Sequence, residues 1–146
     1  MGKRVLITGG AGFIGSHFAL HLLRQYPDYE VIVLDALTYA GNRANLHEAE
    51  GNPRFHFIHA DVRDRHAVRD ALQGVQLVAH LAAETHVDRS ILNPDAFITT
   101  DVYGTFVMLE VAREQGVERF LHVSTDEVYG PVESGACNED APLRPS

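Results

Sequence analysis

The chain has 146 residues, of which 45% are hydrophobic and 22% are charged, as is usual for one globular domain. Its net charge of -8 argues against a nucleic-acid-binding surface, and no apolar run approaches the roughly 20 residues that span a bilayer. The N-terminus has no signal-peptide pattern, and the single cysteine, Cys137, cannot form an internal disulfide, so we expect a cytoplasmic protein.

Five short apolar runs alternate with segments of helical length. The predicted strands are 5–7, 31–34, 55–58, 77–79 and 120–123, and the predicted helices are 13–25, 64–73 and 94 to about 115, with a loop and a short helix over 39–51. Most of these strands are continuously apolar, as in parallel strands buried on both faces. The alternation predicts an α/β, Rossmann-like fold: a doubly wound parallel sheet with helices on both faces.

A glycine-rich turn joins the first predicted strand to the first helix. Gly9, Gly12 and Gly15 follow the spacing G-x-x-G-x-x-G, which allows a tight turn, close approach of a pyrophosphate and close packing of helix on strand. The helix N-terminus would offer free N–H groups to the phosphates. A purely structural turn is the alternative, but the context predicts a dinucleotide site.

Acidic residues follow the second and third predicted strands. Asp35 lies 20 residues after Gly15, where a carboxylate can bind an adenosine ribose and repel a 2′-phosphate, which favours NAD over NADP. Asp61 could contact an adenine amino group or could cap the next turn, and the residues leave both readings open.

The fourth predicted strand leads into LAAETHVDRS, where small residues would let a cofactor pass close by. In open α/β sheets, ligands bind beyond the carboxyl ends of the strands, so all these strand ends should border one crevice. His86 and Asp88 suggest a metal only weakly, because no second histidine stands at ligand spacing and there is no cysteine cluster. We therefore expect no metal.

The long predicted helix begins with Asn93 as a capping residue and Pro94 at its first position. It carries a stripe of apolar residues, for which a core-facing role is the plain interpretation. The stripe consists of Phe97, Ile98, Val102, Phe106, Leu109 and Val111.

The fifth predicted strand leads directly into Thr125, Asp126 and Glu127. Two adjacent carboxylates at a strand end could act as an acid and base pair, if their environments separate the two pKa values. Two solvated acids in a turn are the alternative.

Together these segments resemble the extended short-chain dehydrogenase/reductase family and, within it, the dTDP-glucose 4,6-dehydratases. The resemblance covers essentially the whole chain, and its more specific segments are DALTYAGN, AAETHVDRSI and STDEVYG. It implies a tightly bound NAD and a nucleotide-sugar substrate that loses water to become a 4-keto-6-deoxy sugar. By this resemblance Glu127 removes the C5 proton, Asp126 protonates the departing C6 hydroxyl, and Thr125 hydrogen-bonds the C4 oxygen.

The resemblance also implies the remaining site residues and a homodimer formed through the long helix and the helix that carries the family's tyrosine. Expected cofactor-binding residues are Gly9, Gly12, Phe13, Ile14, Gly15, Asp35, Leu37, Thr38, Gly41, Asp61, Val62, Leu81, Ala82 and Ala83. Expected substrate-binding residues are Glu84, Thr85 and His86. The dimer surface would be incomplete in this chain and partly exposed.

Two departures from the family pattern stand out. Asp101 occupies a position where the family usually has Asn, which puts the local hydrogen bonding in doubt. The family's Y-x-x-x-K pair is absent, and the only lysine is Lys3. We therefore expect residues 1–146 to be a truncated NAD-binding Rossmann domain that lacks the Tyr/Lys helix, the last strands and the nucleotide-sugar domain, and that is inactive alone.

Other functions stay open from the residues. A 4-epimerase or a UDP-glucuronate decarboxylase would share most of the motifs, although an epimerase needs no acid pair to eliminate water. A non-catalytic nucleotide-binding module is the alternative from a different class, and the missing Y-x-x-x-K pair is compatible with it.

Overall fold

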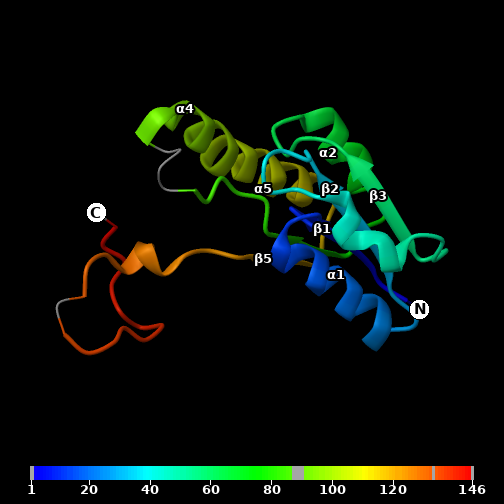
Figure 1. Ribbon diagram of the computed structural model, residues 1–146, viewed down its shortest axis with the longest axis horizontal. Helices are drawn as coiled ribbons and strands as arrows, with labels where there is room; N and C mark the ends of the chain where they lie inside the picture. The colour runs from blue at the N-terminus through cyan, green and yellow to red at the C-terminus, as the bar shows by residue number, and fades with distance from the viewer. Residues whose placement is uncertain (1, 87–90, 133, 146) are drawn as a thin grey trace.

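The computed structural model describes residues 2–86, 91–132 and 134–145. The described residues form one five-stranded parallel sheet with the strand order β3-β2-β1-β4-β5 (Figure 1). Its strands are β1 (Arg4–Thr8), β2 (Glu30–Asp35), β3 (Phe55–His59), β4 (Leu77–His80) and β5 (Arg119–His122). The predicted Rossmann-like, doubly wound sheet is confirmed, and every predicted strand is present with ends within one residue.

Helices cover both faces of the sheet because successive strand residues point to opposite sides. Val5 and Ile7 of β1 pack with α1 (Phe13–Gln25) and the 3-10 helix η1 (Arg43–Ala49). Leu6, between them, packs with α2 (Arg65–Ala71) and α5 (Thr105–Glu114). These two apolar layers are the core.

The residues that precede α2 and α4 differ in how they cap these helices. The Asp64 carboxylate accepts hydrogen bonds from the N–H groups of His66 and Ala67 at 2.9 and 3.2 Å, as expected of a residue that caps α2. Asn93 and Pro94 stand at the N-cap and at the start of α4 (Pro94–Phe97), as predicted, but the Asn93 side chain makes no capping hydrogen bond. Its ψ of 71° lies outside the extended conformation of a capping residue.

The predicted long helix is present, but its middle is a π-helix. α4 continues into η2 (Ile98–Gly104), which is π-helical, and then into α5. A π-helix has more residues per turn than an α-helix. The side chains after it are therefore rotated about the helix axis, relative to where a continuous α-helix would place them. At its end, Gly104 lies so close to Val62 that an added Cβ would come within 2.7 Å of the valine side chain.

The core-facing interpretation of the long helix is therefore wrong for most of its stripe. Ile98, Val102, Phe106 and Leu109 are exposed, whereas Phe97 is half-buried and Val111 is buried. The core-facing residues are Val107, Met108, Val111 and Ala112. The exposed apolar face matches the expectation of a partly exposed surface.

β5 is an edge strand and is less buried than its apolar sequence suggested. Leu121 is 56% exposed, and it lines a groove together with Phe18 and Leu22 of α1. After β5 the chain forms the 3-10 helix η3 (Asp126–Tyr129), which lies away from the sheet in Figure 1. The described residues beyond it form no helix or strand, and the Arg144 N–H donates back to the Val128 carbonyl at 2.9 Å.

No helix in the described part of the chain has the length and apolar character that a membrane crossing requires.

Candidate functional site

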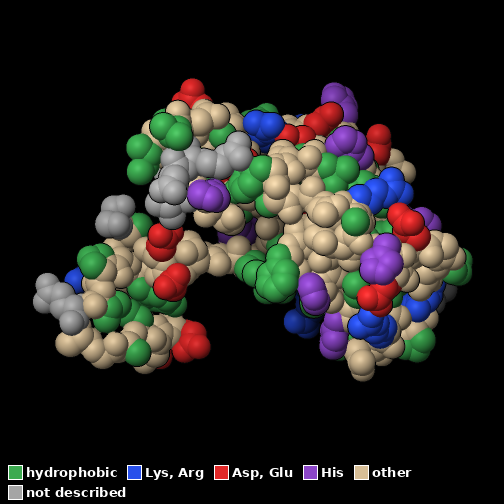
Figure 2. Space-filling model, in the orientation of Figure 1, with side chains coloured by type: hydrophobic (Ala, Val, Ile, Leu, Met, Phe, Trp, Pro, Cys, Tyr) green, Lys and Arg blue, Asp and Glu red, His purple; other side chains and the backbone are tan. Residues whose placement is uncertain are grey.

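The carboxyl ends of the strands border one cavity of about 860 Å³. Figure 2 shows the molecule hollowed between its main body and the C-terminal segment. The predicted site residues that line the cavity are Gly9, Gly12, Phe13, Ile14, Gly15, Asp35, Thr38, Gly41, Asp61, Val62, Leu81, Ala82, Ala83, Glu84, Thr85, Thr125 and Glu127. Of the predicted residues, all of which are described, Leu37, His86 and Asp126 do not line it.

The glycine-rich turn forms the floor of the cavity at the start of α1. A Cβ on Gly15 would lie 2.3 Å from the Gly9 carbonyl oxygen, and one on Gly9 would lie 2.8 Å from the Ala82 nitrogen. Gly9 also has a φ of 67°, which L side chains rarely adopt. Phe13 and Ile14, at the start of the helix, are 80% and 65% exposed, so the N-terminus of α1 is open to a ligand.

Asp35 holds the turn and the loop after β2 in place. Its carboxylate accepts hydrogen bonds from the N–H groups of Ala11 and Leu37, each at 2.8 Å. Leu37 has a φ of 50°, an uncommon conformation for a branched side chain that is often found at functional sites. Because each carboxylate oxygen has two acceptor positions, Asp35 can still accept a hydrogen bond from a ribose hydroxyl.

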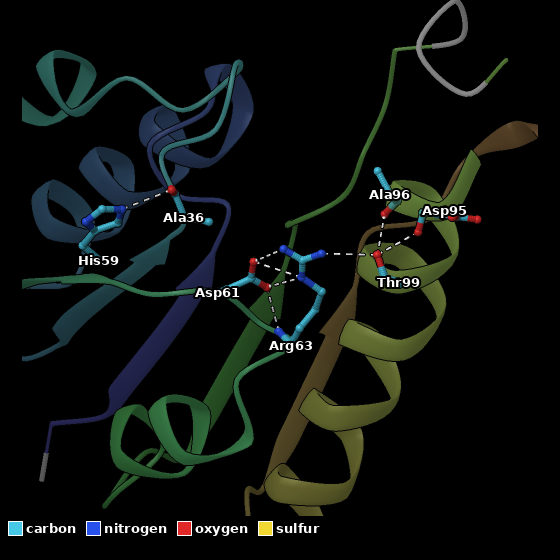
Figure 3. Close-up of polar contacts among 7 residues, drawn as sticks. All are labelled: Ala36, His59, Asp61, Arg63, Asp95, Ala96 and Thr99. Atoms are coloured by element: carbon cyan, nitrogen blue, oxygen red, sulfur yellow. Dashed lines mark hydrogen bonds and ion pairs between the residues drawn. The ribbon is translucent and has the colours of Figure 1, made fainter. Parts of the chain in front are cut away.

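Asp61 and Arg63 form an ion pair at the end of β3 (Figure 3). The guanidinium donates to the Asp61 carboxylate at 2.6 to 3.0 Å and reaches the Thr99 hydroxyl on η2 at 3.3 Å. Burial raises the pKa of Asp61, but the hydrogen bonds and charge of Arg63 outweigh it, and the pKa lies below its ordinary value. Asp61 also accepts from the Arg63 N–H at 2.9 Å, which gives it a turn-forming role.

The segment after β4 is held from two sides. Asp101 of η2 accepts a hydrogen bond from the Glu84 N–H at 2.8 Å. The Tyr39 hydroxyl, from the loop after β2, accepts one from the Thr85 N–H at 3.3 Å. The His86 ring lies edge-on to Tyr39 rather than in the cavity. The segment therefore connects the two sides of the crevice.

Asp101 forms a defined hydrogen bond despite its departure from the family pattern. The pKa of Asp101 lies above its ordinary value, chiefly because the carboxyl group is partly buried. The hydrogen bond from the Glu84 N–H lowers this pKa, and the charge of Glu84 raises it. An Asn at this position could accept the same bond through its amide oxygen. The hydrogen bonding that the substitution placed in doubt is thus present in this chain.

The candidate catalytic residues lie at the start of η3, with Thr125 as its N-cap, and all three are exposed. The Thr125 hydroxyl oxygen accepts from the Glu127 N–H at 3.3 Å and lies 3.5 Å from an Asp126 carboxylate oxygen, to which it donates. Successive residues of a 3-10 helix point about 120° apart, which explains why Glu127 lines the cavity and Asp126 does not.

Several cavity-lining residues were not predicted from the sequence. They include Arg63, Thr100, Asp101, Thr105, His122 and Ser124. Asp101 and Thr105 are four residues apart, about one helical turn, and this spacing was the only signal that could have identified them. No group of three or more His, Cys, Asp or Glu residues in the described part of the chain is arranged to hold a metal ion, and Asp88 lies outside the described residues.

The chain is similar to known proteins over nearly its whole length. Residues 6–146 match the family described as GDP-mannose 4,6 dehydratase. The chain belongs to this family. The predicted resemblance to dTDP-glucose 4,6-dehydratases is also confirmed, since the enzyme of that name from Streptomyces griseus is 49% identical over 148 residues.

Solved structures of relatives share the fold and much of the sequence. DesIV, a dTDP-glucose 4,6-dehydratase from Streptomyces venezuelae solved with NAD and TYD bound, has a TM-score of 0.92 and 54% identity. The UDP-glucose 4-epimerase of Thermus thermophilus, solved with NAD, has a TM-score of 0.84 and 36% identity.

The match covers nearly all of this chain but only part of each relative. It includes 100% of the chain and 45% of the S. griseus enzyme, and 98% of the chain with 46% of DesIV. For the Thermus epimerase the shares are 98% and 45%. The chain thus spans a little under half the length of the relatives it matches.

Proposed function

We propose that residues 1–146 form the NAD-binding Rossmann domain of a dTDP-glucose 4,6-dehydratase. The observation that carries the proposal is that the glycine-rich turn, Asp35 and the Thr125–Glu127 segment border one cavity. The Tyr/Lys helix, the last strands and the nucleotide-sugar domain of the enzyme would be additional to these residues. The family membership and the NAD-containing relatives support the same proposal.

The residues of the cavity fit NAD along its whole length. The pyrophosphate would lie at the open N-terminus of α1, where any side chain on Gly15 would collide with the turn. Asp35 would bind the adenosine ribose, with Asp61 near the adenine and Ala82 beside the nicotinamide end. When bound, NAD supplies the hydride acceptor and donor of the reaction. The Asp35 carboxylate would repel the 2′-phosphate of NADP.

The η3 residues would carry out the elimination of water. Thr125 donates a hydrogen bond to the sugar C4 oxygen, and Glu127 takes the C5 proton once C4 is a ketone. Asp126 gives a proton to the C6 hydroxyl, which leaves as water. Over the whole reaction C4 is oxidised and C6 is reduced, so no external oxidant is consumed.

The orientation of η3 adds a requirement to this proposal. Glu127 lines the cavity, whereas Asp126 does not. Asp126 must therefore turn toward the sugar when substrate binds, as catalytic contacts that are loose in a free enzyme tighten in its complex. Glu84 and Thr85, which line the cavity, would contact the sugar, and His86 would have to move from Tyr39 to join them.

The exposed face of η2 and α5 would form part of a homodimer surface. Ile98, Val102, Phe106 and Leu109 give it the apolar character of a protein interface. In a cytoplasmic dimer this face would be covered. Size-exclusion chromatography of the 146-residue chain tests the expectation that it self-associates, and a clean monomer would contradict it.

Nucleotide binding by the purified chain is the first test of the proposed function. We expect saturable binding of NAD, much weaker binding of NADP, and a reduced preference in the Asp35→Asn variant. Arg24→Gln, on the exposed face of α1, is a control that should bind NAD as the parent chain does. Equal affinity for NAD and NADP, or no binding of either, would overturn the cofactor assignment.

Product analysis tests the reaction itself. We expect the 146-residue chain alone to make no 4-keto sugar from dTDP-glucose, and the whole protein to make it with loss of water. Glu127→Gln in the whole protein should remove the activity while NAD binding persists.

Epimerisation is the second candidate, because the Thermus epimerase shares the fold. An epimerase would return a sugar that has kept its C6 hydroxyl and has inverted at C4. A product of unchanged mass would therefore favour epimerisation over dehydration.

A further inference from the structure

His80, at the end of β4, lies in the core beneath the cavity and is the only buried histidine among the described residues. Both nitrogens of its ring have partners. Nδ1 lies 2.7 Å from the Thr8 hydroxyl oxygen, and Nε2 lies 3.1 Å from the Thr105 hydroxyl oxygen. The imidazole thus connects β1, β4 and α5 at the point where the strand order reverses. Elsewhere in the chain the histidines are exposed, so this environment is particular to His80.

The contacts of Thr8 determine which ring nitrogen carries the hydrogen. The Thr8 hydroxyl oxygen accepts hydrogen bonds from the N–H groups of Leu81 and Ala82, each at 3.2 Å. A hydroxyl that accepts two such bonds has one hydrogen left to donate, and Nδ1 of His80 stands within reach of it. Nδ1 is therefore an acceptor, and Nε2–H donates to Thr105. The neutral imidazole satisfies all of these groups.

The backbone held by Thr8 is part of the cavity wall. Leu81 and Ala82 line the cavity, whereas His80 does not. The same backbone contacts the glycine-rich turn, since a Cβ on Gly9 would lie 2.8 Å from the Ala82 nitrogen and 2.9 Å from the Leu81 carbonyl carbon. A small displacement of Ala82 would therefore move two walls of the cavity together.

We infer that His80 is a positioning residue for the cofactor, which holds the Leu81–Ala82 backbone against the glycine-rich turn by accepting the Thr8 hydroxyl hydrogen. The inference rests on the proposed function for the identity of the ligand, and it adds a residue that does not touch the cavity. If the imidazole only filled space, an apolar side chain of similar length would serve as well. If it acts through Thr8, the acceptor at Nδ1 is the necessary part.

The test compares variants that keep or remove that acceptor. His80→Leu removes it, whereas the amide oxygen of His80→Asn can stand near the position of Nδ1. His21→Leu, at an exposed position of α1, is the matched control. We expect NAD to bind about tenfold more weakly to His80→Leu, as for one hydrogen bond left unmade, and expect His80→Asn to recover most of the loss. Unchanged NAD affinity in folded His80→Leu, or equal losses in Leu and Asn, would overturn the inference.

A second pair of variants applies where His80→Leu does not fold. Thr8→Ser keeps the hydroxyl and Thr8→Val removes it, while both preserve a small side chain on β1. We expect Thr8→Ser to bind NAD as the parent does and Thr8→Val to bind it about tenfold more weakly. Equal affinities in the two variants would contradict a role for the hydroxyl.

A measurement without ligand separates this inference from the proposed function. Nitrogen-15 NMR of the parent protein should show His80 as the neutral tautomer with hydrogen on Nε2, and the Ala82 amide resonance should shift in His80→Asn less than in His80→Leu. If the parent binds no NAD, the proposed function fails, but the NMR measurement still tests the hydrogen bonds between His80 and Thr8. Hydrogen on Nδ1 would overturn the inference whether or not NAD binds.

Discussion

The cavity walls from β1, β2 and β4 are held by buried hydrogen bonds, whereas η3, on the opposite side, is held by exposed and local ones. Asp35 is 7% exposed and accepts two backbone N–H groups, both at 2.8 Å. Thr125 is exposed and accepts one, at 3.3 Å, from a residue two positions away. The difference indicates that the proposed cofactor side is rigid before any ligand binds, and that the proposed catalytic side can adjust to a substrate.

The largest effect is expected from the glycine-rich turn. Gly9 and Gly116 have φ values of 67° and 70°, but an added Cβ meets the Ala82 backbone at Gly9 and nothing within 4 Å at Gly116. Gly116→Ala should lower the unfolding free energy by only about 1–2 kcal/mol, because alanine is strained in the left-handed conformation. Gly9→Ala should cost about 3–5 kcal/mol of unfolding free energy, because the collision adds to it, and should weaken NAD binding. Urea unfolding of both variants measures the difference, and equal losses would show that the collision is relieved.

Acid should destabilise the β4 side through His80. Burial of the imidazole, with a smaller contribution from the charge of His122, lowers the pKa of His80 from 6.5 to about 4. The unfolded chain therefore takes up this proton at higher pH than the folded chain does. The contribution of neutral His80 to the unfolding free energy is fully present above pH 6.5. It is lost as the pH falls toward 4, and the total loss is about 3 kcal/mol.

The His80→Asn variant isolates this contribution, because its amide does not titrate. Its unfolding free energy should fall less than that of the parent over the same pH range. Parallel curves for the two proteins would show that His80 does not resist protonation in the fold.

Substitution of the two hydrogen-bond acceptors compares the regions directly. Asp35→Ala leaves two N–H groups without their acceptor and should cost about 2 kcal/mol of unfolding free energy. Thr125→Val removes an exposed bond at the end of a four-residue helix and should cost less than about 1 kcal/mol. Denaturant titration measures both, and a larger loss from Thr125→Val would contradict the proposed difference in rigidity.

The smallest effect on stability is expected from the acids of η3. Asp126→Asn and Glu127→Gln change exposed side chains, so the unfolding free energy should stay within about 0.5 kcal/mol of the parent value. NAD affinity should also be unchanged, because the proposed cofactor contacts lie on the other walls. Calorimetric titration with NAD checks this, and a clear loss of affinity would place these acids against the cofactor.

The strands could be predicted closely from the sequence because their signal is local. Runs such as 31–34 are apolar over consecutive residues, and acids or glycines follow them, so both the element and its end are visible in a few residues. The glycine-rich turn is equally local. These features also led to most of the residues that border the cavity, although the binding and catalytic roles assigned to them remain predictions.

The long helix shows where local signals end. Its apolar residues were expected to face the core, but Ile98, Val102 and Phe106 are exposed. The helix packs on the core through Val107, Met108, Val111 and Ala112 instead. Asn93 had the residue type of a cap but not the backbone conformation. Neither outcome can be read from residue spacing, because each depends on how the helix packs against the rest of the chain.

The sequence by itself determined the strand and helix segments, the glycine-rich turn and the family, since each depends on residues close together along the chain. Tertiary packing places β5 at an edge, leaves Asp126 out of the cavity lining, and buries His80 against the Thr8 hydroxyl. The last of these joins residues 72 positions apart. Burial and hydrogen-bond partners of this kind are properties of the folded neighbourhood, and chain spacing does not encode them.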